Sequence, residues 1–331
     1  MRAVIHIGLT KTGTSSLQQA FDGERDLLAR HGISFLLPPG RKPPVDHRLA
    51  NAVARNDRAA IEERWREIEP LTEDARTVLI SSENFQNAAA EGIAALKDVL
   101  DRRLSNPDYT IYVGIRRWAD RLASLWQQAV RHGSPAALPT YVEAQLAAPA
   151  PGHPLDVARP IARWSGAFGR QAVVVSSMDQ ALESGQDIAA YAFHELFGIA
   201  GLKHRYLANV SVIEQTELIR AINMRHVEML PVQRRAIIRS VLRFWERQKP
   251  NVLAASELIA KRLQTLSIAD DHPLFRQLEA NSGYAFPSRP PRAWRFAPDA
   301  VFDERDIRAL VSAIDKKAVQ RAQRVSSQRA R

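Results

Sequence analysis

Short apolar runs alternate with amphipathic stretches along the first 200 residues. Continuous apolar runs of strand length occur at Ala3–Ile7, Gly32–Leu37, Arg76–Ser81, Thr110–Ile115 and Ala172–Ser176. Between them, apolar residues recur at helical spacing, as at residues 15–30, 93–104, 122–126 and 161–168, the last ended by Gly169. Apolar strands separated by helices are typical of a parallel sheet with helices on both faces. The pattern therefore predicts an α/β fold.

The last third of the chain has a different pattern. Apolar residues follow a helical period from Val212 to Gln248, and residues 284–302 are rich in proline, arginine and aromatic side chains. The final stretch, residues 316–331, is polar and basic. We therefore predict a core at residues 1–210 and a helical and irregular C-terminal extension of the same domain at residues 211–331, with a basic tail.

Composition narrows the class of protein. The 331 residues carry a formal net charge of +10 and include no cysteine, which excludes disulfides and thiolate metal sites. No apolar run approaches the length of a transmembrane segment, so we expect a cytoplasmic protein. The positive charge fits anionic ligands. It equally fits arginines spread over a solvated surface, such as Arg235, Arg239, Arg243 and Arg247 at four-residue spacing.

The strongest chemical signal lies between the first strand and the first helix, at residues 8–16. A loop at this place presents backbone N–H groups at a helix N-terminus, where phosphate binds. We expect mainly amides from Thr12, Gly13 and Thr14, hydroxyls from Ser15 and Ser16, and the ammonium of Lys11 on the transferring group. Lys11 stands two positions before Gly13, whereas a Walker loop has its lysine directly after the second glycine.

This lysine-glycine-hydroxyl loop resembles the 5′-phosphosulfate loop of the sulfotransferase family, especially its bacterial members. The resemblance covers residues 1–215 and implies a P-loop-type sheet and the donor 3′-phosphoadenosine 5′-phosphosulfate (PAPS). Members of the family hold the donor's 3′-phosphate with an arginine at a strand end and a serine eight residues later. Arg116 and Ser124 have that spacing. The fifth strand departs from the common pattern, because it ends at Ser176, Ser177, Met178 and Asp179.

Sulfuryl transfer needs a held donor, a deprotonated acceptor and stabilisation of the leaving oxygen, by analogy with phosphoryl transfer. Lys11 is the candidate for the leaving oxygen, and no metal is expected. Glu83, after the third strand, is the first candidate for the general base, as a glutamate at this place serves in glycan sulfotransferases. His47 is the second, since other branches of the family use histidine.

Two other functional classes remain open. A P-loop kinase or NTPase shares the strand-loop-helix plan, but the displaced lysine and the lack of an acidic Walker B strand disfavour it. A basic nucleic-acid-binding protein is disfavoured by the lack of a recognisable module, so we expect no nucleic-acid partner. The resemblance suggests a carbohydrate or lipid-linked sugar as the acceptor and a nucleotide as the small-molecule donor.

Overall fold

The computed structural model describes residues 1–148, 153–202, 204–206, 213–225, 263–269, 271–284, 286 and 292–297. The chain forms two compact units, and each is described by itself. The first lies within Met1–Arg121, Pro149–Val210 and Pro273–Pro287, and the second within Leu122–Ala148, Ser211–His272 and Ser288–Arg331. The expected extension, including the arginines at 235–247 and the basic tail, lies largely outside the described residues.

The first unit is built on a five-stranded parallel sheet with strand order β2-β3-β1-β4-β5. The strands are β1 (Arg2–His6), β2 (Ile33–Phe35), β3 (Thr77–Ser81), β4 (Asp108–Ile115) and β5 (Val173–Ser177). Strand β1 lies between β3 and β4, with Ile5 opposite Ile80 on one side and Ile111 on the other. These three side chains are buried, as expected for strands with no solvent-facing side. The predicted fold class is confirmed.

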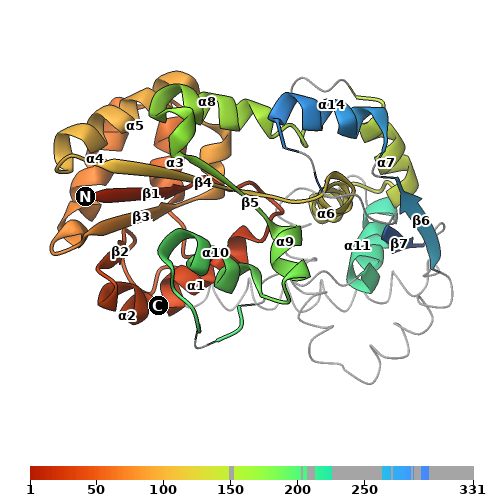
Figure 1. The fold of residues 1–331 in the computed structure, drawn as a ribbon. Coiled ribbons are helices and arrows are strands. Elements are labelled where there is room, and N and C mark those ends of the chain that lie inside the picture. The colour runs from red at the N-terminus through yellow and green to blue at the C-terminus, as the bar shows by residue number, and fades with distance from the viewer. Residues whose placement is uncertain are drawn as a thin grey trace, which may run out of the picture. The chain divides into compact units, whose positions relative to one another are not determined.

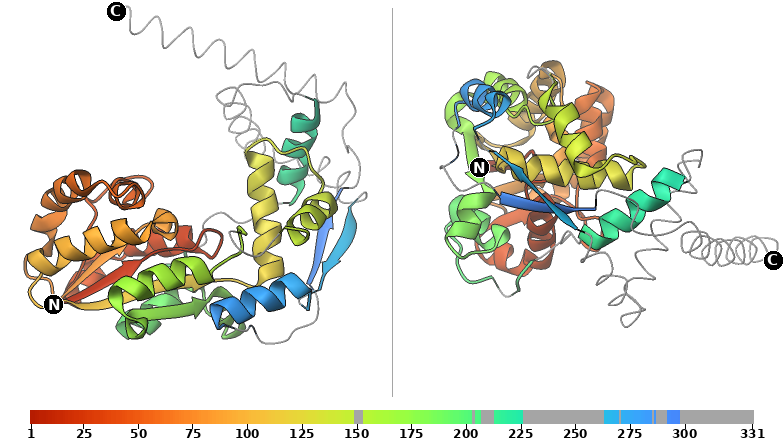
Figure 2. Two further views of the ribbon diagram at one scale, coloured as in Figure 1. Left: turned by 90° about the horizontal axis from the view of Figure 1, so that it is seen from above. Right: turned by 90° about the vertical axis from the view of Figure 1, so that its right-hand side faces the viewer.

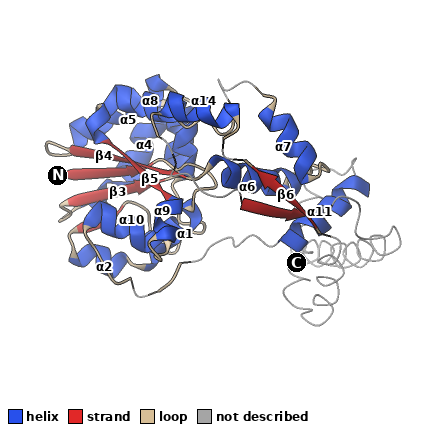
Figure 3. Ribbon diagram, turned by 45° about the vertical axis from the view of Figure 1, so that its right-hand side comes forward, coloured by secondary structure: helices blue, strands red, loops and turns tan. Residues whose placement is uncertain are grey.

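Helices cover both faces of this sheet (Figures 1 and 3). One face carries α3 (His47–Ala54), α4 (Arg58–Ile68), α5 (Ala90–Arg103) and α8 (Ala158–Phe168). The other carries α1 (Thr14–Gly23), α2 (Arg25–Arg30) and α10 (Ile188–Phe197), while α9 (Met178–Glu183) follows β5. Helix α14 (Pro273–Ser282) packs on α8. Three short 3₁₀ helices, η1 (Glu69–Thr72), η2 (Glu83–Asn87) and η3 (Arg170–Ala172), complete the described elements of this unit.

The helical pattern at residues 15–30 forms two helices rather than one. Helix α1 ends at Gly23, and Glu24 separates it from α2 with φ −108° and ψ 27°. The Tyr206 hydroxyl lies only 2.5 Å from where a Cβ on Gly23 would stand, and it donates a 3.0 Å hydrogen bond to Glu24. Glycine is a poor helix former, so the helix bends where Tyr206 packs against it.

Helix α6 (Trp118–Arg131) begins in the first unit and continues into the second, which also holds α7 (Leu138–Leu146) and α11 (Ile213–Arg225). An antiparallel strand pair, β6 (Gln264–Ile268) and β7 (Arg292–Phe296), belongs to this unit (Figure 2). The buried side chains of Glu217 and Arg220 form a 2.6 Å ion pair and bond the two backbone groups of Ala297. No helix in the described part of the chain is long and apolar enough to cross a bilayer.

Candidate anion-binding and active site

The loop between β1 and α1 is held in a conformation that favours glycine. Gly8 and Gly13 have φ values of 110° and 84°, and Lys11 also has a positive φ, 68°. Gly13 stands at the start of α1, where a Cβ would lie 2.6 Å from the Cδ1 of Ile188 on α10. Residue 13 therefore needs glycine for both its dihedral angle and its packing.

Hydrogen bonds tie this loop to its own backbone and to β4. The Thr12 hydroxyl donates to the carbonyl of Leu9 at 2.6 Å, and the Leu9 amide donates to the carbonyl of Gly114 at 3.0 Å. The Gly114 amide donates back to the carbonyl of Gly8 at 2.6 Å. The first N–H groups of α1 lie at the end of this loop, and such groups attract anions. Of the residues predicted to hold the 5′-phosphosulfate, Thr12 and Gly13 are thus in a braced turn, and Thr14, Ser15 and Ser16 begin helix α1.

Glu83 lies directly against the loop. Strand β3 ends at Ser81, and the Ser82 amide donates to the carbonyl of His6 at 3.1 Å, which sets the ends of β1 and β3 side by side. A Cβ on Gly8 would stand 3.2 Å from the Cα of Glu83. The Gln18 side chain, on α1 and 3% exposed, donates to Oε2 of Glu83 at 2.8 Å. The carboxylate is therefore fixed between the loop and the helix that the loop begins.

His47, the other candidate base, approaches the same strand end. Its Nδ1 lies 3.2 Å from the Ser82 hydroxyl oxygen, next to Glu83. Asp46 holds His47 in place by capping α3, because its carboxylate accepts from the Leu49 amide and forms a 2.8 Å ion pair with the buried Arg64. The structure thus brings both candidate bases to the carboxyl end of β3.

His6 is buried at the end of β1, and its Nδ1 lies 2.7 Å from the Ser81 hydroxyl oxygen on β3. Burial lowers the pKa of His6 to about 4, and the nearby charge of Glu83 only partly opposes that shift. At neutral pH the ring is therefore uncharged. It links two strands beneath the loop.

Arg116 directly follows β4, as predicted. The next amide, that of Arg117, donates to the carboxylate of Asp179 at 2.8 Å. Burial raises the pKa of Asp179, and this hydrogen bond and the charges of Arg116 and Arg117 oppose the shift. Ser124 lies on α6, in the part that belongs to the second unit. The sequence pattern did not mark Asp179 as a site residue, although it marked the end of β5 as unusual.

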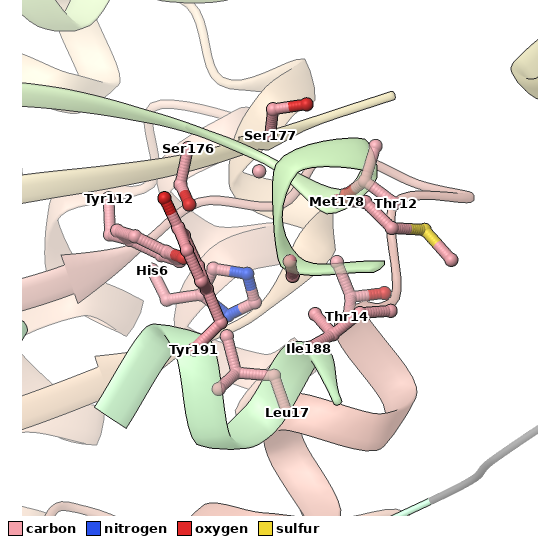
Figure 4. A pocket seen from close by; sticks show the side chains of 12 residues that line it. His6, Thr12, Thr14, Leu17, Tyr112, Ser176, Ser177, Met178, Ile188 and Tyr191 are labelled. Carbon is pink, nitrogen blue, oxygen red and sulfur yellow. The ribbon is translucent and has the colours of Figure 1, made fainter. Parts of the chain in front are cut away.

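A small cavity with both polar and apolar lining residues adjoins the loop on the side of α10 (Figure 4). Residues of β1, the loop, α1, β4, β5, α9 and α10 line it; those with polar side chains include His6, Thr12, Thr14, Tyr112, Ser176 and Tyr191. Tyr112 is 3% exposed and accepts a hydrogen bond from Ser176, and burial raises the pKa of its hydroxyl. A tyrosine within an apolar strand looks like a core residue, so sequence reasoning missed this cavity.

No group of three or more histidine, cysteine or acidic residues that could hold a metal ion occurs in the part of the chain that the structure describes. The site described so far is made of backbone amides, hydroxyls and separate charged side chains. Such donors suit an anion.

Comparisons with known proteins give one distant likeness. No family model and no curated protein matches the chain. Among solved structures, a sulfotransferase from Alicyclobacillus acidocaldarius is similar, with a TM-score of 0.40 and 15% identity over 71% of this chain and 95% of that one. This likeness is too distant to assign an activity, so the function rests on the site.

Proposed function

We propose that this chain is a PAPS-dependent sulfotransferase that transfers a sulfuryl group to a hydroxyl or amine acceptor. The observation that carries the proposal is a carboxylate fixed beside a phosphate-type loop. Gln18 holds Glu83 at 2.8 Å, and Glu83 lies against Gly8 of the loop. In parallel α/β sheets, ligands gather at the carboxyl ends of the strands. An anion donor and an acceptor base therefore belong at this edge.

Each residue of the loop has a proposed task. The amides of Thr12, Gly13 and Thr14, with the hydroxyls of Ser15 and Ser16, bind the phosphosulfate. Glu83 takes the acceptor's proton as the acceptor oxygen or nitrogen forms its bond to sulfur. The bond between sulfur and the bridging oxygen breaks, and Lys11 stabilises the charge left on that oxygen. The products are the sulfated acceptor and adenosine 3′,5′-bisphosphate.

Arg116 and Ser124 are the proposed ligands of the 3′-phosphate. A guanidinium offers several donors in one plane, which suits phosphate oxygens, and a hydroxyl adds one short bond. The position of Arg116 at the end of β4, beside the Asp179 carboxylate, supports a role at the same edge of the sheet. The acceptor proposed from the family resemblance is a glycan or a lipid-linked sugar.

The Arg116→Ala variant tests this assignment of the donor. It is expected to weaken binding of adenosine 3′,5′-bisphosphate by about 1.5–3 kcal/mol, the scale of a hydrogen bond to a charged group, and to leave AMP binding unchanged. Calorimetry measures both. Arg163→Ala, which removes a guanidinium bonded to the carbonyl of Ala88, is the matched control. An equal loss of affinity for the bisphosphate and for AMP would show that Arg116 does not bind the 3′-phosphate.

A further inference from the structure

Arg121 contacts the loop between β1 and α1 directly. This residue of α6 is 3% exposed. Its Nε donates to the carbonyl of Thr10 at 3.3 Å, and its Nη1 donates to the carbonyl of Leu155 at 3.3 Å. Sequence reasoning did not single it out, because an arginine five residues after Arg116, within a helical stretch, looks like a surface residue of that helix.

The charge of Arg121 has no ion-pair partner among the residues that the structure describes. The acidic group that acts on it electrostatically is Asp156, whose carboxylate already accepts from the amides of Ala158 and Arg159. Burial lowers the pKa of Arg121 to about 10, so the group keeps its proton at neutral pH. A buried cation paired only with carbonyl groups carries a desolvation cost that an anion nearby would offset.

The contact with Thr10 also sets the direction of a loop amide. In a trans peptide group, the carbonyl of one residue and the N–H of the next point in opposite directions. Arg121 binds the carbonyl of Thr10, so the amide of Lys11 points away from Arg121. The Thr10 amide is held from another side by the Gln86 side chain, at 3.2 Å. The backbone of Thr10 is thus held at both its N–H group and its carbonyl group.

We propose that Arg121 is a positioning residue for anion binding: it fixes the Thr10–Lys11 peptide and supplies a buried positive charge that an anion in the loop neutralises. It acts through its hydrogen bond to the carbonyl of Thr10. The inference rests on the proposed function only in requiring that the loop bind an anion. It is independent of whether that anion carries a 3′-phosphate.

The test compares the full-length chain with Arg121→Met, Arg121→Gln and Arg121→Lys, using inorganic pyrophosphate and adenosine 3′,5′-bisphosphate as calorimetric probes. Both neutral variants are expected to bind each probe at least tenfold more weakly than the parent. The lysine variant, which keeps the charge, is expected to stay within about threefold, since charge is the larger part of the effect. Arg163→Met is the control for losing a guanidinium that bonds a backbone carbonyl. It should bind both probes as the parent does.

Thermal unfolding of the free proteins gives the second measurement. Because Arg121 is proposed to serve binding, its neutral variants should fold and lose no more melting temperature than Arg163→Met does. Parental affinity in a neutral variant, failure of both neutral variants to fold, or failure of the parent to bind either probe would overturn the proposal. If pyrophosphate binds through Arg121 but the bisphosphate binds no better than ADP, the donor assignment fails and Arg121 keeps its role.

Discussion

The proposed role of Glu83 as the general base can be tested by a single substitution. Its carboxylate is held by Gln18 and lies against Gly8. Glu83→Gln keeps the shape but removes the base, so acceptor turnover should fall by roughly 10²-fold or more, while binding of adenosine 3′,5′-bisphosphate stays unchanged. Steady-state kinetics and calorimetry on the same variant measure the two effects.

The rival base makes the opposite prediction. His47→Ala removes the imidazole beside Ser82 and leaves the contact between Gln18 and Glu83 in place. If His47→Ala loses turnover while Glu83→Gln keeps most of it, the base is His47. The donor assignment survives that result, because neither side chain belongs to the proposed donor-binding set.

Lys11 should act on the transition state more than on the bound product. Lys11→Ala removes the positive charge proposed to stabilise the leaving oxygen, a change that commonly costs on the order of 10²–10³ in rate. The bisphosphate product should still bind, since the loop amides remain. Single-turnover kinetics beside product titration separates the two effects. Near-normal turnover would mean that another cation stabilises the leaving oxygen.

Some residues of the proposed site could be predicted from the sequence, and others could not. Lys11, Gly13 and Arg116 stand within or beside strand ends and a turn, so local pattern found them. Gln18 and Arg121 act through contacts with residues 65 and 111 positions away, respectively, and no local pattern records such a contact. These contacts depend on which elements the fold brings together, and the local pattern does not give that.

At the scale of elements, long apolar runs were predicted well because burial on both faces leaves no alternation to misread. All five strands of the parallel sheet were found, with ends shifted by one or two residues. The pair β6 and β7 was missed. Its strands are short and mostly exposed, and the 23 residues between them contain a helix, so no hairpin signal exists.

The bond between β1 and β3 through His6 has a pH dependence. The pKa of His6 falls to about 4 in the folded protein. The unfolded chain therefore binds more protons than the folded chain below the ordinary histidine pKa near 6.5. Stability that is full above pH 6.5 is therefore lost as the pH falls toward 4. Between pH 7.5 and pH 5, the titration of His6 should lower the free energy of unfolding by about 2 kcal/mol.

Urea unfolding of the parent chain and His6→Gln at the two pH values tests this prediction. The glutamine variant has no imidazole to protonate, so its stability should fall less between pH 7.5 and pH 5. An equal fall in both proteins would show that the histidine is not the titrating group. The comparison with the glutamine variant is needed because carboxylates elsewhere in the chain titrate in both proteins.

At the scale of the whole molecule, the chain does not divide at one point. Residues 122–148 belong to the second unit although they precede β5, and residues 273–287 belong to the first. Patterns along a sequence favour contiguous domains, because they show only which residues are close along the chain. The proposed boundary at residue 210 remains a prediction. The C-terminal extension thus contributes α14 to the first unit and β6 and β7 to the second.

The central claim is that the chain binds a nucleotide with both a 5′- and a 3′-phosphate. Competitive calorimetry of the full-length chain with adenosine 3′,5′-bisphosphate, ADP and AMP, without added metal, tests it most directly. The account predicts that the bisphosphate binds at least tenfold more tightly than either other nucleotide, because Arg116 adds a charged hydrogen bond that only a 3′-phosphate accepts. Equal affinity for all three, or binding and turnover of ATP that require Mg²⁺, would contradict it.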